Sequence, residues 1–177
     1  MTEYQKFSDL EHYLFKEVGP RFRSSGKLKP LDLFLILHWK SWRAKKKARD
    51  RLKKIAGSFD KATKEIAASL HEATNSKERM QILMQKWRFR LPTATAILSV
   101  LYPKDFTIYD IRVRTQLRQV PIRESYSKTH WDTIWISYIR FKQAVKQKTP
   151  RGLCLRDKDR YLWGKSVFKD AQRDRRA

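Results

Sequence analysis

The sequence predicts an all-α protein, and three observations carry that prediction. Glycine and proline are scarce, with 5 and 6 copies in 177 residues. Apolar side chains recur at helical spacing over most of the chain, which places them on one face of each helix. Residues that cap or break helices stand in the gaps between these stretches. We therefore expect nearly the whole chain to be helical.

Caps and breakers set the expected boundaries. Gly19-Pro20 and Pro121 are expected to end the helices before them, and Ser58 and Asn75 to cap the helices after them. The predicted helices are Glu3–Val18, Pro30–Trp42 with a basic continuation, Phe59–Ala73, Lys77–Trp87, Thr93–Leu101, a helix opened by Asp110, Trp131–Lys146 and Leu155–Phe168. The remaining stretches are a basic loop at Arg21–Lys29, an extended segment at Phe106–Tyr109 and a frayed polar tail at Lys169–Ala177.

Composition favours a single compact domain over residues 1–177, built as one unit or as two packed lobes. Hydrophobic residues make up 41% of the chain, enough for a real core. The single cysteine, Cys154, excludes an internal disulfide and fits a reducing cytosol. The N-terminus lacks a signal pattern, and the longest apolar run, Leu33–Leu37, is far too short to span a membrane. We expect a cytoplasmic monomer with no membrane partner.

Charge is the strongest compositional signal. Lys and Arg number 41 against 18 Asp and Glu, a formal net charge of +23. A polyanion is the partner that best tolerates such an excess, so we expect double-stranded DNA; a ribosomal partner, a membrane surface and simple solubility are the alternatives. The densest run is Lys40–Lys54, which either contacts phosphates or forms a solvated helix face. Its candidate contacts are Lys40, Lys45, Lys46 and Lys47.

Several kinds of site have no support in the sequence. The four histidines are not spaced as metal ligands, and the acidic residues are scattered singly among cations rather than clustered for two metal ions. The chain has neither a glycine-rich phosphate loop nor a Gly-x-Ser-x-Gly turn. We expect no metal and no cofactor.

One segment carries a more specific pattern. Residues 87–113 read WRFRLPTATAILSVLYPKDFTIYDIRV, which is a tight turn, a small-residue helix, a loop and an aspartate at a helix start. This segment resembles the helix-hairpin-helix DNA glycosylases, whose hairpin has the pattern Leu-Pro-Gly-Val-Gly-x-x-Thr-Ala and is followed about sixteen residues later by an aspartate. Aligned on Thr93-Ala94, the hairpin is 88–92 and the aspartate is Asp110. Residues 37–41 and 160–163 resemble flanking elements of small bacterial members more weakly.

The resemblance implies a two-lobed helical fold with the hairpin and the aspartate facing a cleft. It implies that Asp110 stabilises the cation-like sugar as a glycosidic bond breaks, while aromatic side chains hold a base flipped out of the duplex. The expected base-pocket residues are Trp39, Trp42 and Tyr109, and the expected DNA contacts are Arg88, Phe89, Arg90, Thr93, Lys104 and Arg112. The alternatives are that Asp110 is only a helix cap, that the aromatic residues belong to the core, and that Arg112 is a salt-bridge partner of Asp110.

Two departures from the family pattern bear on function. Arg88 and Arg90 replace both hairpin glycines, which in the family let backbone amides approach a phosphate. Pro92 stands where strand-cutting members carry a lysine nucleophile. The resemblance therefore implies a monofunctional glycosylase that leaves an abasic site, although Lys40 or another lysine is not excluded as a neighbour in space.

The expected function is excision of a damaged or modified base. The departures from repair-type motifs suggest a bulky modified pyrimidine as substrate, such as the glucosylated hydroxymethylcytosine of phage DNA, and hence antiviral defence, with DNA repair as the open alternative. Two other hypotheses stay open: a DNA-binding module of the same fold without catalysis, and an abasic-site lyase that uses an unrecognised lysine.

Overall fold

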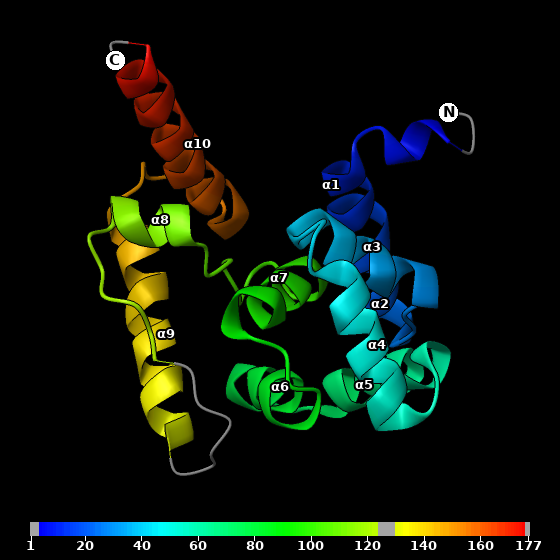
Figure 1. Ribbon diagram of the computed structural model, residues 1–177. Helices are drawn as coiled ribbons and strands as arrows, with labels where there is room; N and C mark the ends of the chain where they lie inside the picture. The colour runs from blue at the N-terminus through cyan, green and yellow to red at the C-terminus, as the bar shows by residue number, and fades with distance from the viewer. Residues whose placement is uncertain (1–3, 124–129, 176–177) are drawn as a thin grey trace.

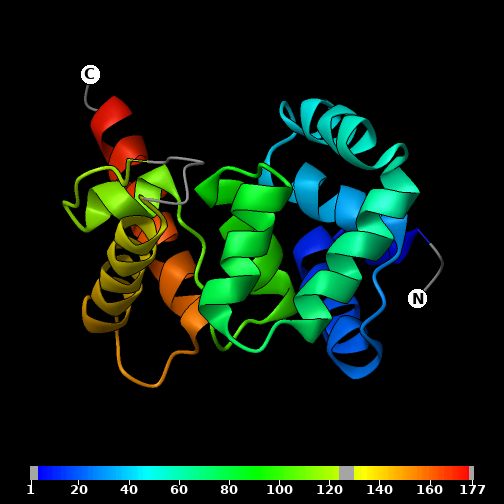
Figure 2. The ribbon, with the colours of Figure 1, turned by 90° about the horizontal axis from the view of Figure 1, so that it is seen from below.

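The computed structural model describes residues 4–123 and 130–175, and every regular element within those ranges is a helix, so the all-α prediction is confirmed. Helices α1–α5 lie on one side of α7, and α8–α10 lie on the other (Figures 1 and 2). The helices are α1 (Leu10–Tyr13), α2 (Gly19–Ser25), α3 (Pro30–Lys40), α4 (Lys45–Ala56), α5 (Phe59–Glu72), α6 (Ser76–Gln81), α7 (Leu91–Leu101), α8 (Ile111–Gln116), α9 (Trp131–Gln147) and α10 (Leu155–Asp174).

The central helix α7 connects the two groups. Leu91 and every residue from Ala94 to Leu101 are buried. The apolar ones, from Leu91 to Leu101 and apart from Ala96, belong to one hydrophobic cluster that runs from Tyr13 to Leu162. The small side chains of α7 let its neighbours approach closely. A Cβ atom added to Gly19 of α2 would lie 2.3 Å from the carbonyl oxygen of Val100, so the two backbones are in contact there.

The prediction that Gly19-Pro20 ends the first helix is wrong. The chain stays helical through a π-helical segment, Leu14–Val18, into α2, and it leaves the helix only at Gly26, where φ is +67°. Pro20 follows directly on the π-helical segment, so its missing N–H falls where the α-helical hydrogen-bond pattern is already interrupted. The predicted basic loop is thereby shortened to the residues after Ser25.

The predicted caps are confirmed. The side chains of Ser58 and Asn75 accept hydrogen bonds from the backbone N–H groups of Lys61 (3.1 Å) and Glu78 (2.9 Å). These bonds fix the starts of α5 and α6.

The C-terminal boundaries differ from prediction. Helix α8 ends at Gln116, well before Pro121, because Arg118 adopts a left-handed φ of +54° and Gln119 N–H donates to the carbonyl of Arg114. Helix α10 continues to Asp174, so most of the predicted frayed tail is helical.

Candidate functional site

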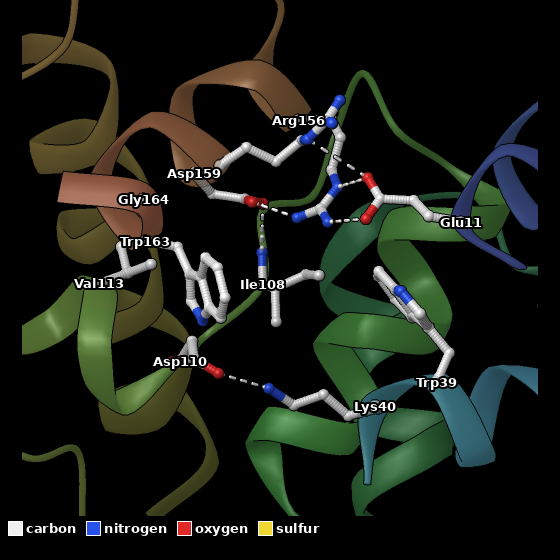
Figure 3. Close-up of a pocket in the computed structure, with 11 residues that line it drawn as sticks. Glu11, Trp39, Lys40, Ile108, Asp110, Val113, Arg156, Asp159, Trp163 and Gly164 are labelled. Carbon is white, nitrogen blue, oxygen red and sulfur yellow. Dashed lines mark hydrogen bonds and ion pairs between the residues drawn. The ribbon is translucent and has the colours of Figure 1, made fainter. Parts of the chain in front are cut away.

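A cavity of about 600 Å³ lies between the two groups of helices (Figure 3). One wall comes from α1 and α3, and the other comes from α8, α10 and the segment before α8. Its lining residues are Glu11, Trp39, Lys40, Ile108, Asp110, Val113, Arg156, Asp159, Arg160, Trp163 and Gly164. The volume is within the range of small-molecule sites.

Asp110 lies in this cavity and forms an ion pair across it. Its Oδ2 atom is 2.7 Å from Nζ of Lys40, the last residue of α3, and its Oδ1 accepts a hydrogen bond from the backbone N–H of Arg112 (2.9 Å). Asp110 is therefore the cap of α8 and a pocket residue at once, so these two hypotheses are compatible. Its side chain keeps 22% of its surface exposed, which leaves the carboxylate accessible.

The pKa of Asp110 is lowered from its ordinary value by the balance of several effects. Burial raises it, but the charge and hydrogen bond of Lys40, the backbone N–H of Arg112 and the Arg112 charge together outweigh burial. Asp110 is consequently ionised at neutral pH, as a carboxylate that stabilises a developing cation has to be.

The extended segment before Asp110 is fixed by buried side chains. The Tyr138 hydroxyl accepts from the N–H of Thr107 (3.0 Å) and donates to the carbonyl of the same residue (2.9 Å). Thr95 Oγ1 in α7 accepts from the N–H of Tyr109 (3.0 Å). These bonds satisfy backbone groups that have no strand partner, and they set the position of Asp110.

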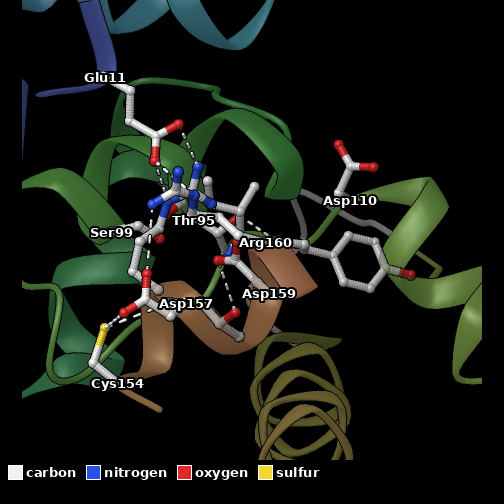
Figure 4. Close-up of polar contacts among 12 residues, drawn as sticks. Glu11, Thr95, Ser99, Asp110, Cys154, Asp157, Asp159 and Arg160 are labelled. Carbon is white, nitrogen blue, oxygen red and sulfur yellow. Dashed lines mark hydrogen bonds and ion pairs between the residues drawn. The ribbon is translucent and has the colours of Figure 1, made fainter. Parts of the chain in front are cut away.

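Asp159 of α10 holds the same segment from the other side (Figure 4). Its Oδ2 accepts from Thr107 Oγ1 (3.2 Å) and from the N–H of Ile108 (3.3 Å), while its Oδ1 pairs with Arg156. Burial raises the pKa of Asp159 to about 6 despite the opposing effect of Arg156. Burial also raises the pKa of Tyr138, so that phenol stays neutral.

Arg156 connects the two walls of the cavity. Its guanidinium binds Glu11 of α1 (2.9 Å) as well as Asp159, and it lies 5.2 Å from the ring centres of both Phe15 and Trp39. Because this ion-pair network and the Lys40 pair of Asp110 both cross the cavity, two separate contacts hold its walls together.

Two tryptophans lie on opposite walls of the cavity (Figure 3). Trp39 was predicted from the sequence, but Trp163 was not, because nothing in the sequence placed α10 opposite α3. Two signals pointed to Trp163: its large apolar side chain near those of Val167 and Phe168, and its place in residues 160–163, which weakly resemble a flanking element of the glycosylases.

The other two predicted pocket aromatics are not in the cavity lining. Tyr109 is buried, its ring packs edge-on against Phe141, and its hydroxyl accepts from the N–H of Ile122. Trp42 lies in the turn between α3 and α4, 68% exposed, with Lys45 Nζ 3.2 Å from its ring centre. Helix α3 ends at Lys40, so Trp42 lies beyond the helix, in the turn, and does not line the cavity.

Of the two positions that the resemblance assigns to hairpin glycines, Arg88 has a glycine-like backbone, whereas Arg90 is extended with a φ of −70°. Arg88 has a φ of +56°, the left-handed conformation that favours glycine. Arg88 and Arg90 have exposed side chains, and Thr93 lies half-buried in the first turn of α7. Phe89, which was also predicted to contact DNA, has a fully buried side chain, and its N–H donates to the carbonyl of Leu83.

The predicted cationic contacts divide into exposed and paired side chains. Lys46, Lys47 and Lys104 are exposed. Lys45 lies 3.0 Å from His38 Nδ1, and burial together with the Lys45 charge lowers the pKa of His38. Arg112 pairs with Asp170 of α10 rather than with the Asp110 carboxylate.

Comparisons with known proteins add no relative. No protein-family model, curated protein or solved structure matches the chain. None of the helices described is both long and apolar enough to span a membrane. Over the same ranges, no three His, Cys, Asp or Glu side chains gather as a metal site would require.

Proposed function

We propose that this protein is a monofunctional DNA N-glycosylase, a hydrolase that excises a flipped base and leaves an abasic site. The observation that carries the proposal is an ionised Asp110 in a cavity bounded by Trp39 and Trp163. Its support outside the cavity is the hairpin resemblance and the charge of +23.

In the proposed reaction, water attacks C1′ of the nucleotide and the C1′–N bond breaks. The bond electrons leave with the base, and the proton lost by the water is transferred to the base. Asp110 stabilises the cation-like sugar and orients the water. For this the Lys40 ammonium has to move away from the Asp110 carboxylate, and a sugar carrying positive charge takes its place.

The tryptophans suit the base half of the substrate. A flipped base stacks well between aromatic side chains, and these are available on both walls. A cavity of about 600 Å³ with Glu11, Arg156 and Arg160 on its lining also suits a substituent larger and more polar than a plain base. This favours a bulky modified pyrimidine, such as glucosylated hydroxymethylcytosine of phage DNA, and hence a role in antiviral defence rather than in DNA repair.

A second candidate activity, abasic-site lyase, is favoured by one contact. Lys40 Nζ lies 2.7 Å from the Asp110 carboxylate, so an amine is beside the proposed reacting carbon even though Pro92 replaces the family's lysine. In that reaction the neutral amine condenses with the sugar aldehyde, water leaves, and β-elimination breaks the 3′ C–O bond. The ion-paired ammonium would first have to lose its proton.

Base release from a panel of DNAs tests the proposed glycosylase. The panel contains unmodified, damaged and phage-derived hypermodified duplexes, and mass spectrometry identifies the freed base. We expect release by the wild type, loss of release in Asp110→Asn and retained binding in that variant. Borohydride reduction on abasic DNA separates the two activities, since a covalent adduct that disappears in Lys40→Met indicates the lyase. Binding without release from any DNA in the panel would instead indicate a non-catalytic DNA-binding module.

The DNA partner has its own test. Arg88, Arg90, Lys46 and Lys47 have exposed side chains that suit phosphate contacts, so affinity for duplex DNA should fall steeply as salt rises from low to physiological concentration. A flat dependence on salt would contradict a phosphate-binding surface.

A further inference from the structure

The outer face of α10 carries apolar side chains that the core does not cover. Trp163, Val167 and Phe168 are 48%, 37% and 63% exposed, and Figure 1 shows this half of the helix projecting away from the other elements. Val167 is four residues after Trp163 and lies on the same side of the helix, and Phe168 borders Val167, so these side chains form a stripe. Clustered exposed apolar side chains of this size mark an interaction surface.

Gly164 lies within this stripe and has no structural reason to be glycine. It lies inside a 20-residue helix, where glycine is about 1 kcal/mol less favourable than alanine. A Cβ atom added there would meet nothing within 4 Å, so no neighbour requires the bare backbone. Since Gly164 also lines the cavity, the missing side chain leaves a flat patch of helix beside Trp163 that a planar ring can approach.

The stripe has cations beside it. Arg160 lies just before the stripe in α10, Lys165 and Lys169 lie along its length, and all three are exposed. Exposed aromatic and apolar side chains interleaved with cations suit a ligand that is both planar and anionic, which is the chemistry of an unpaired nucleic-acid strand. The stripe also continues directly from the cavity, because Trp163 and Gly164 belong to both.

We propose that the stripe formed by Trp163, Gly164, Val167 and Phe168 binds bases of the strand that enters the cavity. Trp163 and Gly164 contact the flipped base, and Val167 and Phe168 contact the neighbouring one. One helical turn, about 5 to 6 Å, separates Gly164 from Phe168, which is comparable to the step between neighbouring bases of an extended strand. This inference rests on the proposed function and adds a strand-binding surface to it.

Two variants and a control test the stripe. Binding to a short single-stranded oligonucleotide, and to a duplex with a stable abasic analogue, is measured over a range of salt. We expect Phe168→Ser to weaken binding about tenfold with an unchanged salt slope, because stacking is lost and no phosphate contact is. Gly164→Ala should raise the melting temperature and still weaken binding. The control variant Ile136→Ser, at a 50% exposed position on α9, should change neither the binding affinity nor its salt dependence.

The possible outcomes each decide the question. Wild-type affinity in both stripe variants overturns the proposal. The proposal is also overturned if the wild type self-associates in sedimentation and Phe168→Ser abolishes that association, because a second copy of the chain would then occupy the stripe. It is overturned as well if the stripe is needed for binding to anionic lipid vesicles and the protein does not bind the oligonucleotide. If the wild type releases no base but the variants still weaken strand binding, the stripe stands and the glycosylase proposal fails.

Discussion

Asp110 and Asp159 are two carboxylates of one cavity with opposite environments. Asp110 is partly exposed, and its side chain is held by one lysine and one backbone N–H. Asp159 is almost completely buried and binds Arg156, Thr107 and the N–H of Ile108. The pKa of the first is lowered and the pKa of the second is raised.

The difference indicates which carboxylate is available for chemistry. Two of the three partners of Asp159, Thr107 and Ile108, belong to the segment that precedes Asp110, so releasing them would disturb that segment. The Asp110 carboxylate pairs with a single ammonium, that of Lys40, whose place a cation-like sugar would take in the proposed reaction. We infer that Asp159 holds the segment that positions Asp110, and that Asp110 is the carboxylate that acts on the substrate. Four predictions test these two roles.

The largest expected effect is on catalysis. Asp110→Asn should slow base release about a thousandfold, because the neutral amide no longer stabilises the developing cation. The free energy of unfolding should change by less than about 1 kcal/mol, since asparagine caps a helix as well as aspartate does. Single-turnover base release and urea unfolding measure the two quantities. A variant that is inactive and also strongly destabilised would mean that Asp110 is mainly structural.

The next effect is on stability. Asp159→Ala should lower the free energy of unfolding by about 3 kcal/mol, because it leaves two buried hydrogen-bond donors of the segment unpaired and removes one of the two carboxylate partners of Arg156. Asp170→Ala, which breaks an exposed pair with Arg112, is the matched control and should cost less than about 1 kcal/mol. Urea unfolding of both variants measures the two losses in the free energy of unfolding. Losses of similar size would contradict the role of Asp159 in positioning the segment before Asp110.

A smaller effect is expected in the pH dependence of stability. The pKa of Asp159 is raised to about 6 in the folded protein, so its contribution is fully present below its unfolded pKa of about 4 and is lost as pH rises through 6. The loss should be on the order of 2 kcal/mol. Between pH 4 and 7, the free energy of unfolding should therefore fall less with pH in Asp159→Asn than in the wild type. Equal pH dependence of the two proteins would contradict this.

The smallest effect concerns the lysine. Lys40→Met removes the charge that helps lower the pKa of Asp110, so that pKa should rise and the acid limb of the activity profile should move to higher pH. The rate at neutral pH should stay close to that of the wild type if Asp110 acts alone. Complete loss of activity would instead favour Lys40 as the nucleophile of a lyase.

Local features of this site were predictable, whereas its long-range contacts were not. The helix start at Asp110 and the caps at Ser58 and Asn75 depend on a few neighbouring residues, so the sequence pattern predicted them. The ion pair of Lys40 with Asp110 joins residues 70 positions apart, and spacing along the chain contains no information on such a contact.

The aromatic residues illustrate the same limit. Trp39 and Trp42 are both large residues at the end of one helix, and only the break after Lys40 decides that the first lines the cavity and the second does not. Trp163 lies on the opposite wall because α10 packs against α8 on the far side of α7. A helical pattern predicts which face of a helix is buried, but it does not predict which other helix that face meets.

The Tyr138 hydroxyl has a consequence for how the chain tolerates change in length. It binds both backbone groups of Thr107, as a neighbouring β-strand would, yet it is a single fixed point rather than a ladder. A segment paired to a ladder can slip by a whole register and pair again, whereas this one cannot. Inserting one residue between Thr107 and Asp110 would move the carboxylate by about 3.3 Å with no alternative pairing to compensate, so the length of this short segment should be as strictly constrained as the identity of Asp110.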